Sequence, residues 1–348
     1  MVGEAALIGR QPSEAAPSEN SSVRRAGRLL ANRDVAIVLV ALAIFAVFSI
    51  IAPNFLAASV MIDLARRSAI LGILSVGMTF LFVAGEFDLS IGSHYGFLLI
   101  LLAKLTENLG LDPWVASLLI LLAGTAIGAV NGILVTRIGL PSFIATLGML
   151  ILLRGATQTL SSGYPIPAKN TGLAFYQSIR ANFAGTDLPN VFVLMLVIVA
   201  IGGLILAKTK FGSDVYSTGG NQEAARNTGI DTRRVKFICF VGMGTLVGLC
   251  SALLYGRVGL APLGAGNNLE LQVIAAVIIG GTSLFGGRGT VFGSLMGVFI
   301  LGMITSGIIL SGISQFWDGV GTAVVILIAA ELNILVQRAS DRLVRREA

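Results

Sequence analysis

The feature that most constrains this chain is a series of about ten apolar runs separated by short polar segments. The hydrocarbon core of a bilayer is about 30 Å thick, so a helix that crosses it needs about 20 mainly apolar residues. Only 12% of the 348 residues are charged, which is about half the share in soluble domains. The runs are centred on Val35–Ala52, Ser68–Gly85, Ile91–Leu105, Trp114–Val135, Ser142–Leu160, Val191–Ala207, Phe237–Tyr255, Leu271–Leu284, Val291–Leu310 and Val320–Leu335. We therefore predict an all-α integral membrane protein with about ten transmembrane helices, of which the third and eighth are short enough to be broken or re-entrant.

The distribution of lysine and arginine predicts the orientation of these helices. Basic residues concentrate in residues 1–34, 208–236 and 338–348, which lie on one side of the membrane if the spans alternate. The positive-inside rule places that side in the cytoplasm. We therefore predict two cytoplasmic tails, residues 1–34 and 338–348, flanking a transmembrane domain at residues 35–337.

Two segments on the opposite, outer side leave alternatives open. Arg66 and Arg67 do not follow the positive-inside rule, so a re-entrant or interfacial segment near Asn54–Arg67 is an alternative to a regular span. The long polar segment 161–190 is rich in turn-forming residues. It could fold over the outer mouth of the bundle or simply connect two spans.

A polar, basic segment at residues 208–236 interrupts the apolar runs on the cytoplasmic side. Within it, Glu223, Ala224, Ala225 and Arg226 are good helix formers, and Gly229 is a typical helix stop. We predict a short helix outside the bilayer with a charged face, which a soluble partner can contact.

The first of two clusters of polar residues and glycine lies at Gly85–Ser93. It contains the carboxylates of Glu86 and Asp88 and the hydroxyls of Ser90 and Ser93. Ionised groups at membrane depth are costly, and irregular backbone is tolerated there only inside protein or beside water. The cluster is therefore either a helix break that lines a translocation path or its gate, or a short cytoplasmic turn in which Asp88 caps the next helix.

The second cluster, Ile279–Thr290, combines glycine pairs with Thr282 and Ser283. Glycine lets a helix unwind or lets two backbones approach closely. A broken helix here, facing the first cluster, would suit a transporter site at the middle of the membrane. Packing of glycine between helices explains the same pattern.

Several classes of chemistry are excluded by the sequence. Gly202–Thr209 lacks the second glycine of a P-loop and ends an apolar run, so it predicts no nucleotide site. Cys239 and Cys250 fall in one apolar run and form neither a disulfide framework nor a metal-binding spacing. The basic residues flank apolar runs, which indicates topology rather than nucleic-acid binding. We expect no cofactor, no metal and no catalytic group in this chain.

Four stretches resemble, in chain order, motifs of the permease subunits of bacterial ATP-binding-cassette importers for simple sugars, the ribose, xylose and galactose group. Gly77–Ser93 is similar to GMT…GGIDLSVGS, Leu140–Gly155 to PSFIxTLGxxxxxRG, Gly219–Ile230 to GGNxEAARxxGI, and Ile274–Gly289 to IAAVVIGGTSLxGGxG. These four stretches lie between Gly77 and Gly289, and the resemblance as a whole extends from about residue 35 to 335. Glu86 and Phe87 replace the commoner Gly-Ile of the first motif, so the resemblance does not extend to the identity of the sugar.

This resemblance implies a multi-pass permease of the bacterial inner membrane, surrounded by lipid and paired with a second permease copy. A cytoplasmic ATPase subunit would dock on residues 223–229, and a periplasmic sugar-binding protein would deliver the substrate, so this chain would be no enzyme. A permease for a branched-chain amino acid or a nucleoside is one alternative. An ion-coupled secondary transporter that uses Glu86 and Asp88 is another, but it would need no docking helix.

Overall fold

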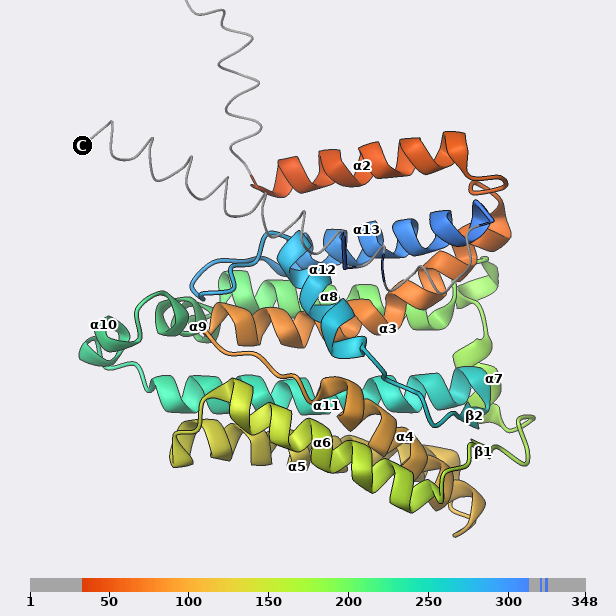
Figure 1. The fold of residues 1–348 in the computed structure, drawn as a ribbon, viewed down its shortest axis with the longest axis horizontal. Helices are drawn as coiled ribbons and strands as arrows, with labels where there is room; N and C mark the ends of the chain where they lie inside the picture. The colour runs from red at the N-terminus through yellow and green to blue at the C-terminus, as the bar shows by residue number, and fades with distance from the viewer. Residues whose placement is uncertain (1–32, 313–319, 321–322, 325–348) are drawn as a thin grey trace, which may run out of the picture.

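The computed structural model describes residues 33–312, 320, 323 and 324 (Figure 1). The predicted tenth span, centred on Val320–Leu335, and the two predicted tails lie largely outside these residues. In the part that is described, seven helices are long and apolar enough to cross a membrane. They are α2 (Arg33–Ile51), α3 (Ala58–Val83), α5 (Pro113–Ile133) with its π-helical continuation η1 (Leu134–Ile138), α6 (Ser142–Ser161), α8 (Asn190–Lys208), α11 (Thr232–Val258) and α13 (Val291–Leu310).

The two runs that the sequence marks as short form shorter helices. The third run is α4 (Ile91–Glu107) and the eighth is α12 (Leu269–Ile279). At about 1.5 Å per residue, α12 extends only about 16 Å, half the thickness of the hydrocarbon core. The prediction of an all-α membrane protein is confirmed, although only seven of the described helices have the length and composition of a complete span.

The N-terminal part of α3 is a regular helix that begins earlier than the predicted run. This helix begins at Ala58, well before the predicted run, and continues without a break through Arg66 and Arg67. Its 26 residues extend about 39 Å, more than the hydrocarbon core, so its outer turns can lie beyond the apolar layer. The two arginines are therefore part of a long regular helix, and no re-entrant segment forms there.

The two long polar loops lie at opposite ends of the helical bundle. Helices α9 (Lys210–Gly220) and α10 (Gln222–Asn227) project from one end, and α7 (Ala174–Arg180), β1 (Ile166–Pro167) and β2 (Leu260–Ala261) lie at the other (Figure 1). Helix α8 connects the two ends, and its 19 residues extend about 28 Å, close to the thickness of the hydrocarbon core.

The loop of residues 161–190 is folded rather than a simple connector. Its strand β1 pairs with β2, with Ile166 opposite Ala261. Helix α7 buries the side chains of Phe175 and Tyr176 against the core, and a short 3-10 turn, η2 (Phe183–Gly185), follows. The backbone N–H of Lys169 donates to Glu107 at the end of α4 at 3.0 Å. This loop therefore covers the ends of α4 and α11.

Helices α5 and α11 are in backbone contact through four glycines. A Cβ at Gly128 would lie 3.0 Å from the Cα of Gly244, and one at Gly248 would lie 3.0 Å from the Cα of Leu121. A Cβ at Gly124 would in turn overlap the carbonyl of Gly244. Small residues allow such close approach in membranes, where van der Waals contact drives helix association. We call these four glycines the α5–α11 seam.

The first turns of the two short helices meet. Gly92 lies in the first turn of α4, and a Cβ there would overlap both the carbonyl of Gly266 and the carboxylate of Glu270 on α12. Non-helical backbone precedes both helices, at residues 84–90 and 259–268. The second of these segments contacts the first turn of α4 at this point, and Asp88, Ser90 and Ala261 within the two segments are buried.

Candidate functional site

Asp88 is the centre of a buried hydrogen-bond network at the break before α4. It is only 1% exposed. Its Oδ1 accepts from the backbone N–H of Ser90 at 2.7 Å and from the Ser90 hydroxyl at 2.6 Å, and its Oδ2 accepts from the Asn131 side chain on α5 at 3.1 Å. Asp88 is therefore buried, and its bonds join the turn before α4 to α5.

The other residues of the first cluster have different environments. Ser93 is 4% exposed, and its hydroxyl has no partner among the described residues. Glu86 is paired with Lys236 of α11 at 2.6 Å, and both side chains are nearly buried, 11% and 12% exposed. Lys236 also donates to Gln222 of α10 at 2.9 Å. Glu86 thus connects the helix break to the segment around α10.

The second cluster forms a chain of buried hydroxyls between helices. Thr282 lies 3.4 Å from Ser294 of α13, which accepts from Thr79 of α3 at 2.7 Å. The Ser283 hydroxyl accepts from the backbone N–H of Phe285 at 3.2 Å and thereby shapes its own turn. Thr282 and Ser283 are both buried, and the contact of Thr282 with Ser294 ties the irregular segment after α12 to α13 and, through Thr79, to α3.

The two clusters meet at the end of α9, directly before α10. The backbone N–H of Gly287 donates to the carbonyl of Val83 at 2.9 Å. A Cβ at Gly219 would overlap that same Val83 carbonyl, and one at Gly287 would lie 2.6 Å from the Cα of Gly220. Three segments therefore meet here: the end of α3, the loop after α12 and the start of the α10 segment. Side chains larger than glycine do not fit at Gly219 or Gly287.

Helix α10 has the exposed charged face that the sequence predicts. Asn221 caps it by accepting from the backbone N–H groups of Glu223 and Ala224 at 3.1 and 3.0 Å. Glu223, Ala224 and Arg226 are exposed, and Arg226 Nε donates to Thr232 Oγ1 at 3.0 Å. Gly229 has a φ of +86°, the conformation expected at a helix stop.

Ala225 departs from the expectation that the whole segment is presented to a partner. It is 4% exposed, because a helix of one to two turns that lies on a protein surface must turn one side towards it. Ala225 therefore anchors α10 to the rest of the chain, and the free face consists of its neighbours.

Four further residues of the site are not apparent from the sequence. Two of them contact the segment before α4. Asn131 of α5 donates to Asp88, and Thr146 of α6 accepts from the backbone N–H of Leu89 at 3.1 Å. Lys236 and Gln222 complete the ion pair of Glu86. The sequence offers a signal for two of these residues. Asn131 is a lone amide in an apolar run, and Lys236 is a basic residue at the edge of a run.

We expect replacement of Lys236 by methionine to separate the break before α4 from α10. Losing one partner of a nearly buried ion pair leaves the other charge uncompensated, which costs about 3–5 kcal/mol. Thermal unfolding of the purified protein should therefore shift downward, and transport should fall. The charge-swapped pair Glu86→Lys with Lys236→Glu should recover much of both, and a swap no better than the single change would show that the pair makes no specific contribution.

Within the described residues, no group of three or more histidine, cysteine or acidic side chains could hold a metal ion. Cys239 and Cys250 are both buried and free. The polar groups described above lie in two places. Some form hydrogen-bond networks at the helix breaks, and others lie on the exposed face of α10.

Comparison with known proteins gives a consistent result. Residues 60–330 match the family described as "Branched-chain amino acid transport system / permease component". The chain is 37% identical over 287 residues to the ribose import permease protein RbsC of Bacillus subtilis (strain 168), an alignment that covers 82% of this chain and 88% of that one. It is 36% identical over 286 residues to the inner membrane ABC transporter permease protein YjfF of Escherichia coli (strain K12), covering 81% and 85%.

A third relative is the autoinducer 2 import system permease protein LsrC of Photorhabdus luminescens, 32% identical over 292 residues, with 82% of this chain and 85% of that one aligned. No solved structure matches the chain. The matches and the seven apolar helices identify a multi-pass protein of the inner membrane. The chain belongs to the family of permease components of the branched-chain amino acid type of transport system.

Proposed function

We propose that this chain is the transmembrane permease of an ATP-driven, binding-protein-dependent importer that carries a simple sugar or a related polyol into the cell. The observation that carries this proposal is the 37% identity with a ribose import permease over 82% of the chain. The sequence motifs that resemble sugar permeases agree with it. A permease for another small solute is the second candidate, because one relative is named as an autoinducer 2 permease and the family description names branched-chain amino acids.

In this proposal, ATP hydrolysis belongs to a separate cytoplasmic ATPase subunit that contacts α10. The exposed Glu223, Ala224 and Arg226 and the sharp turn at Gly229 support this docking role. Asp88, Ser90, Ser93, Thr282 and Ser283 would line or shape the translocation path at the two helix breaks. A second copy of the permease would complete the path, and a periplasmic sugar-binding protein would deliver the substrate at the end that carries α7.

The proposal is tested by deleting the gene in its host and measuring uptake of a panel of radiolabelled aldopentoses, aldohexoses and polyols. We expect uptake of one or a few sugars to fall and to return with the intact gene. Branched-chain amino acids, nucleosides and autoinducer 2 belong in the same panel. A loss confined to one of those solutes would replace the sugar proposal with the second candidate.

The orientation of the chain can be tested with single cysteines. Glu223 lies in α10 and Asn170 in the loop that covers α4 and α11, at opposite ends of α8. In a background without Cys239 and Cys250, we expect Glu223→Cys to react with a membrane-impermeant thiol reagent only from the cytoplasm and Asn170→Cys only from outside. Reaction of both from the same side would contradict the proposed orientation.

A further inference from the structure

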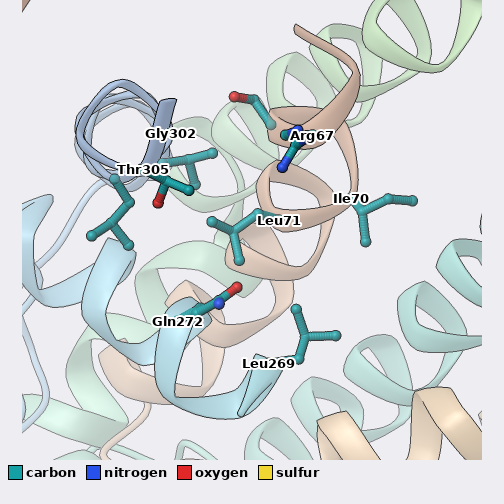
Figure 2. A pocket seen from close by; sticks show the side chains of 10 residues that line it. Arg67, Ile70, Leu71, Leu269, Gln272, Gly302 and Thr305 are labelled. Atoms are coloured by element: carbon teal, nitrogen blue, oxygen red, sulfur yellow. The ribbon is translucent and has the colours of Figure 1, made fainter. Parts of the chain in front are cut away.

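We propose that a cavity between α3, α12 and α13 is a subsite through which the sugar passes in the outer half of the permease. Its volume is about 230 Å³, below the range of about 300–1,000 Å³ that is common for drug-sized ligands. Figure 2 shows its lining, with Arg67 and Leu71 on α3, Leu269 and Gln272 on α12, and Gly302 and Thr305 on α13. This inference rests on the proposed sugar import and adds a place where the sugar is bound.

A buried hydroxyl without a partner points to a ligand in this cavity. Ser68 lines it and is only 2% exposed, and its Oγ makes no hydrogen bond among the described residues. Most buried polar groups in proteins are paired, so an unpaired one calls for a missing partner. The other hydroxyls nearby on α3 are satisfied, as Ser75 Oγ is by the carbonyl of Gly72 at 2.8 Å.

The remaining lining suits a neutral polyol. Gln272 and Thr305 contribute an amide and a hydroxyl, neither of which is bonded to another described residue, and both are half-buried. These groups can both donate and accept hydrogen bonds, as sugar hydroxyls require. The rest of the lining is mainly aliphatic, and it offers contact for the C–H face of a sugar ring. The lining residues are Arg67, Ser68, Ile70, Leu71, Leu269, Gln272, Val298, Leu301, Gly302 and Thr305.

The charges around the cavity favour the same ligand class. Among the described lining residues, Arg67 is the single charged one and none is a carboxylate. The Arg67 side chain is 59% exposed and lies 3.9 Å from Asp63. Because Asp63 already balances its charge, the exposed guanidinium at the rim can donate to neutral hydroxyls without requiring an anionic ligand.

The depth of the cavity agrees with a position on a transport path. Ser68 lies ten residues after the start of α3 at Ala58, which is about 15 Å along the helix axis. Gln272 is in the first turns of α12, the short helix that begins within the bundle. Substrate sites of many transporters lie at such discontinuous helices near the middle of the membrane.

The inference is tested by reconstituting the permease with its ATPase and binding protein in proteoliposomes. The probe is each radiolabelled aldopentose or aldohexose that the wild-type protein transports. Removing one hydrogen bond weakens binding about 2- to 10-fold, so the variant Ser68→Ala with Gln272→Leu should lower the uptake rate about 5- to 50-fold. ATP hydrolysis stimulated by the sugar-loaded binding protein should change less than about twofold, because neither residue belongs to α10 or to the contacts described for it.

Matched controls use the same kinds of substitution outside the cavity. Ser117 of α5 and Thr157 of α6 have hydroxyls bonded to backbone carbonyls at 2.7 Å. We expect Ser117→Ala and Thr157→Val to transport normally, whereas Thr305→Val, inside the cavity, should transport more slowly. Equal uptake rates in the cavity variants and the controls would overturn the subsite.

A second measurement separates sugar from lipid as the occupant. In a background without Cys239 and Cys250, Thr305→Cys should react with a water-soluble methanethiosulfonate, and millimolar amounts of the transported sugar should slow this reaction. Protection by lipid in nanodiscs but not by sugar would assign the cavity to lipid and overturn the inference. If the wild-type protein transports no sugar, the proposed function fails and the subsite with it. If it transports a sugar that does not protect the Thr305→Cys variant, only the subsite fails.

Discussion

Replacement of Asp88 by alanine is expected to abolish uptake while leaving the permease assembled with its ATPase. The carboxylate accepts from the Ser90 backbone and hydroxyl and from the Asn131 amide, all inside the protein. Hydrogen bonds to charged groups contribute about 1.5–3 kcal/mol each, and the donors left behind would be unsatisfied. This loss falls on the start of α4, whereas α10 is held by separate contacts. Uptake and co-purification of the ATPase measure the two effects.

The matched control for this prediction is Asp88→Asn. Asparagine has nearly the same shape and keeps one carbonyl oxygen as an acceptor, but it presents an NH₂ group where Asn131 now donates. We therefore expect intermediate uptake. Normal uptake by Asp88→Ala would mean that the network is dispensable and that the break before α4 is shaped by its glycines alone.

Charge reversal at Glu223 should uncouple the permease from its ATPase. Glu223 is exposed on α10, so its replacement by arginine does not disturb packing, but it reverses a charge that the proposed partner faces. Like charges across an interface can cost several kcal/mol. We expect Glu223→Arg to insert normally, to lose most ATPase association or stimulation, and to abolish uptake.

Asp187→Arg provides the matched control, because it makes the same charge change on an exposed residue in the loop at the opposite end of α8. It should retain its association with the ATPase. Wild-type uptake by Glu223→Arg, with the ATPase still bound, would show that the charge of α10 has no part in coupling.

Gly229 offers a second approach to the same helix. Its φ of +86° is unfavourable for a β-branched residue but is tolerated by asparagine. Since nothing lies within 4 Å of the position of its Cβ, Gly229→Val should act through backbone strain alone and impair coupling, while Gly229→Asn should preserve it. Equal coupling to the ATPase in Gly229→Val and Gly229→Asn would show that the backbone conformation of this turn does not determine coupling.

The sequence predicts the helices well because their physical origin is local. The length and apolar content of a run determine whether it can cross a bilayer, and nine of the ten predicted runs coincide with helices among the described residues. Gly229 likewise marks the end of the α10 segment through its own backbone preference. The start of α3 was less predictable, because Arg66 and Arg67 lower the apolar content of turns that nevertheless remain helical.

The contacts between distant segments could not be predicted in this way. Glu86 and Lys236 are separated by 150 positions, and neither residue carries a local signal for the other. The sequence places Glu86 near Asp88 and beside a possible translocation path, but it gives no sign of the ion pair with Lys236 that the structure shows. Ser68 and Glu270 show the same limit, since only the three-dimensional packing reveals that their polar atoms are buried and unpaired.

The α5–α11 seam has a consequence for how the permease can move. With glycine backbones in contact, sliding or rotation of one helix past the other would drive larger side chains into main-chain atoms. The two helices should therefore travel as one rigid body. Helix α11 begins shortly after α10 ends, and α5 carries Asn131, which binds Asp88. A force on α10 would thus move α11 and α5 together and so displace the start of α4. The backbone would bend only at the helix breaks on either side of this rigid pair.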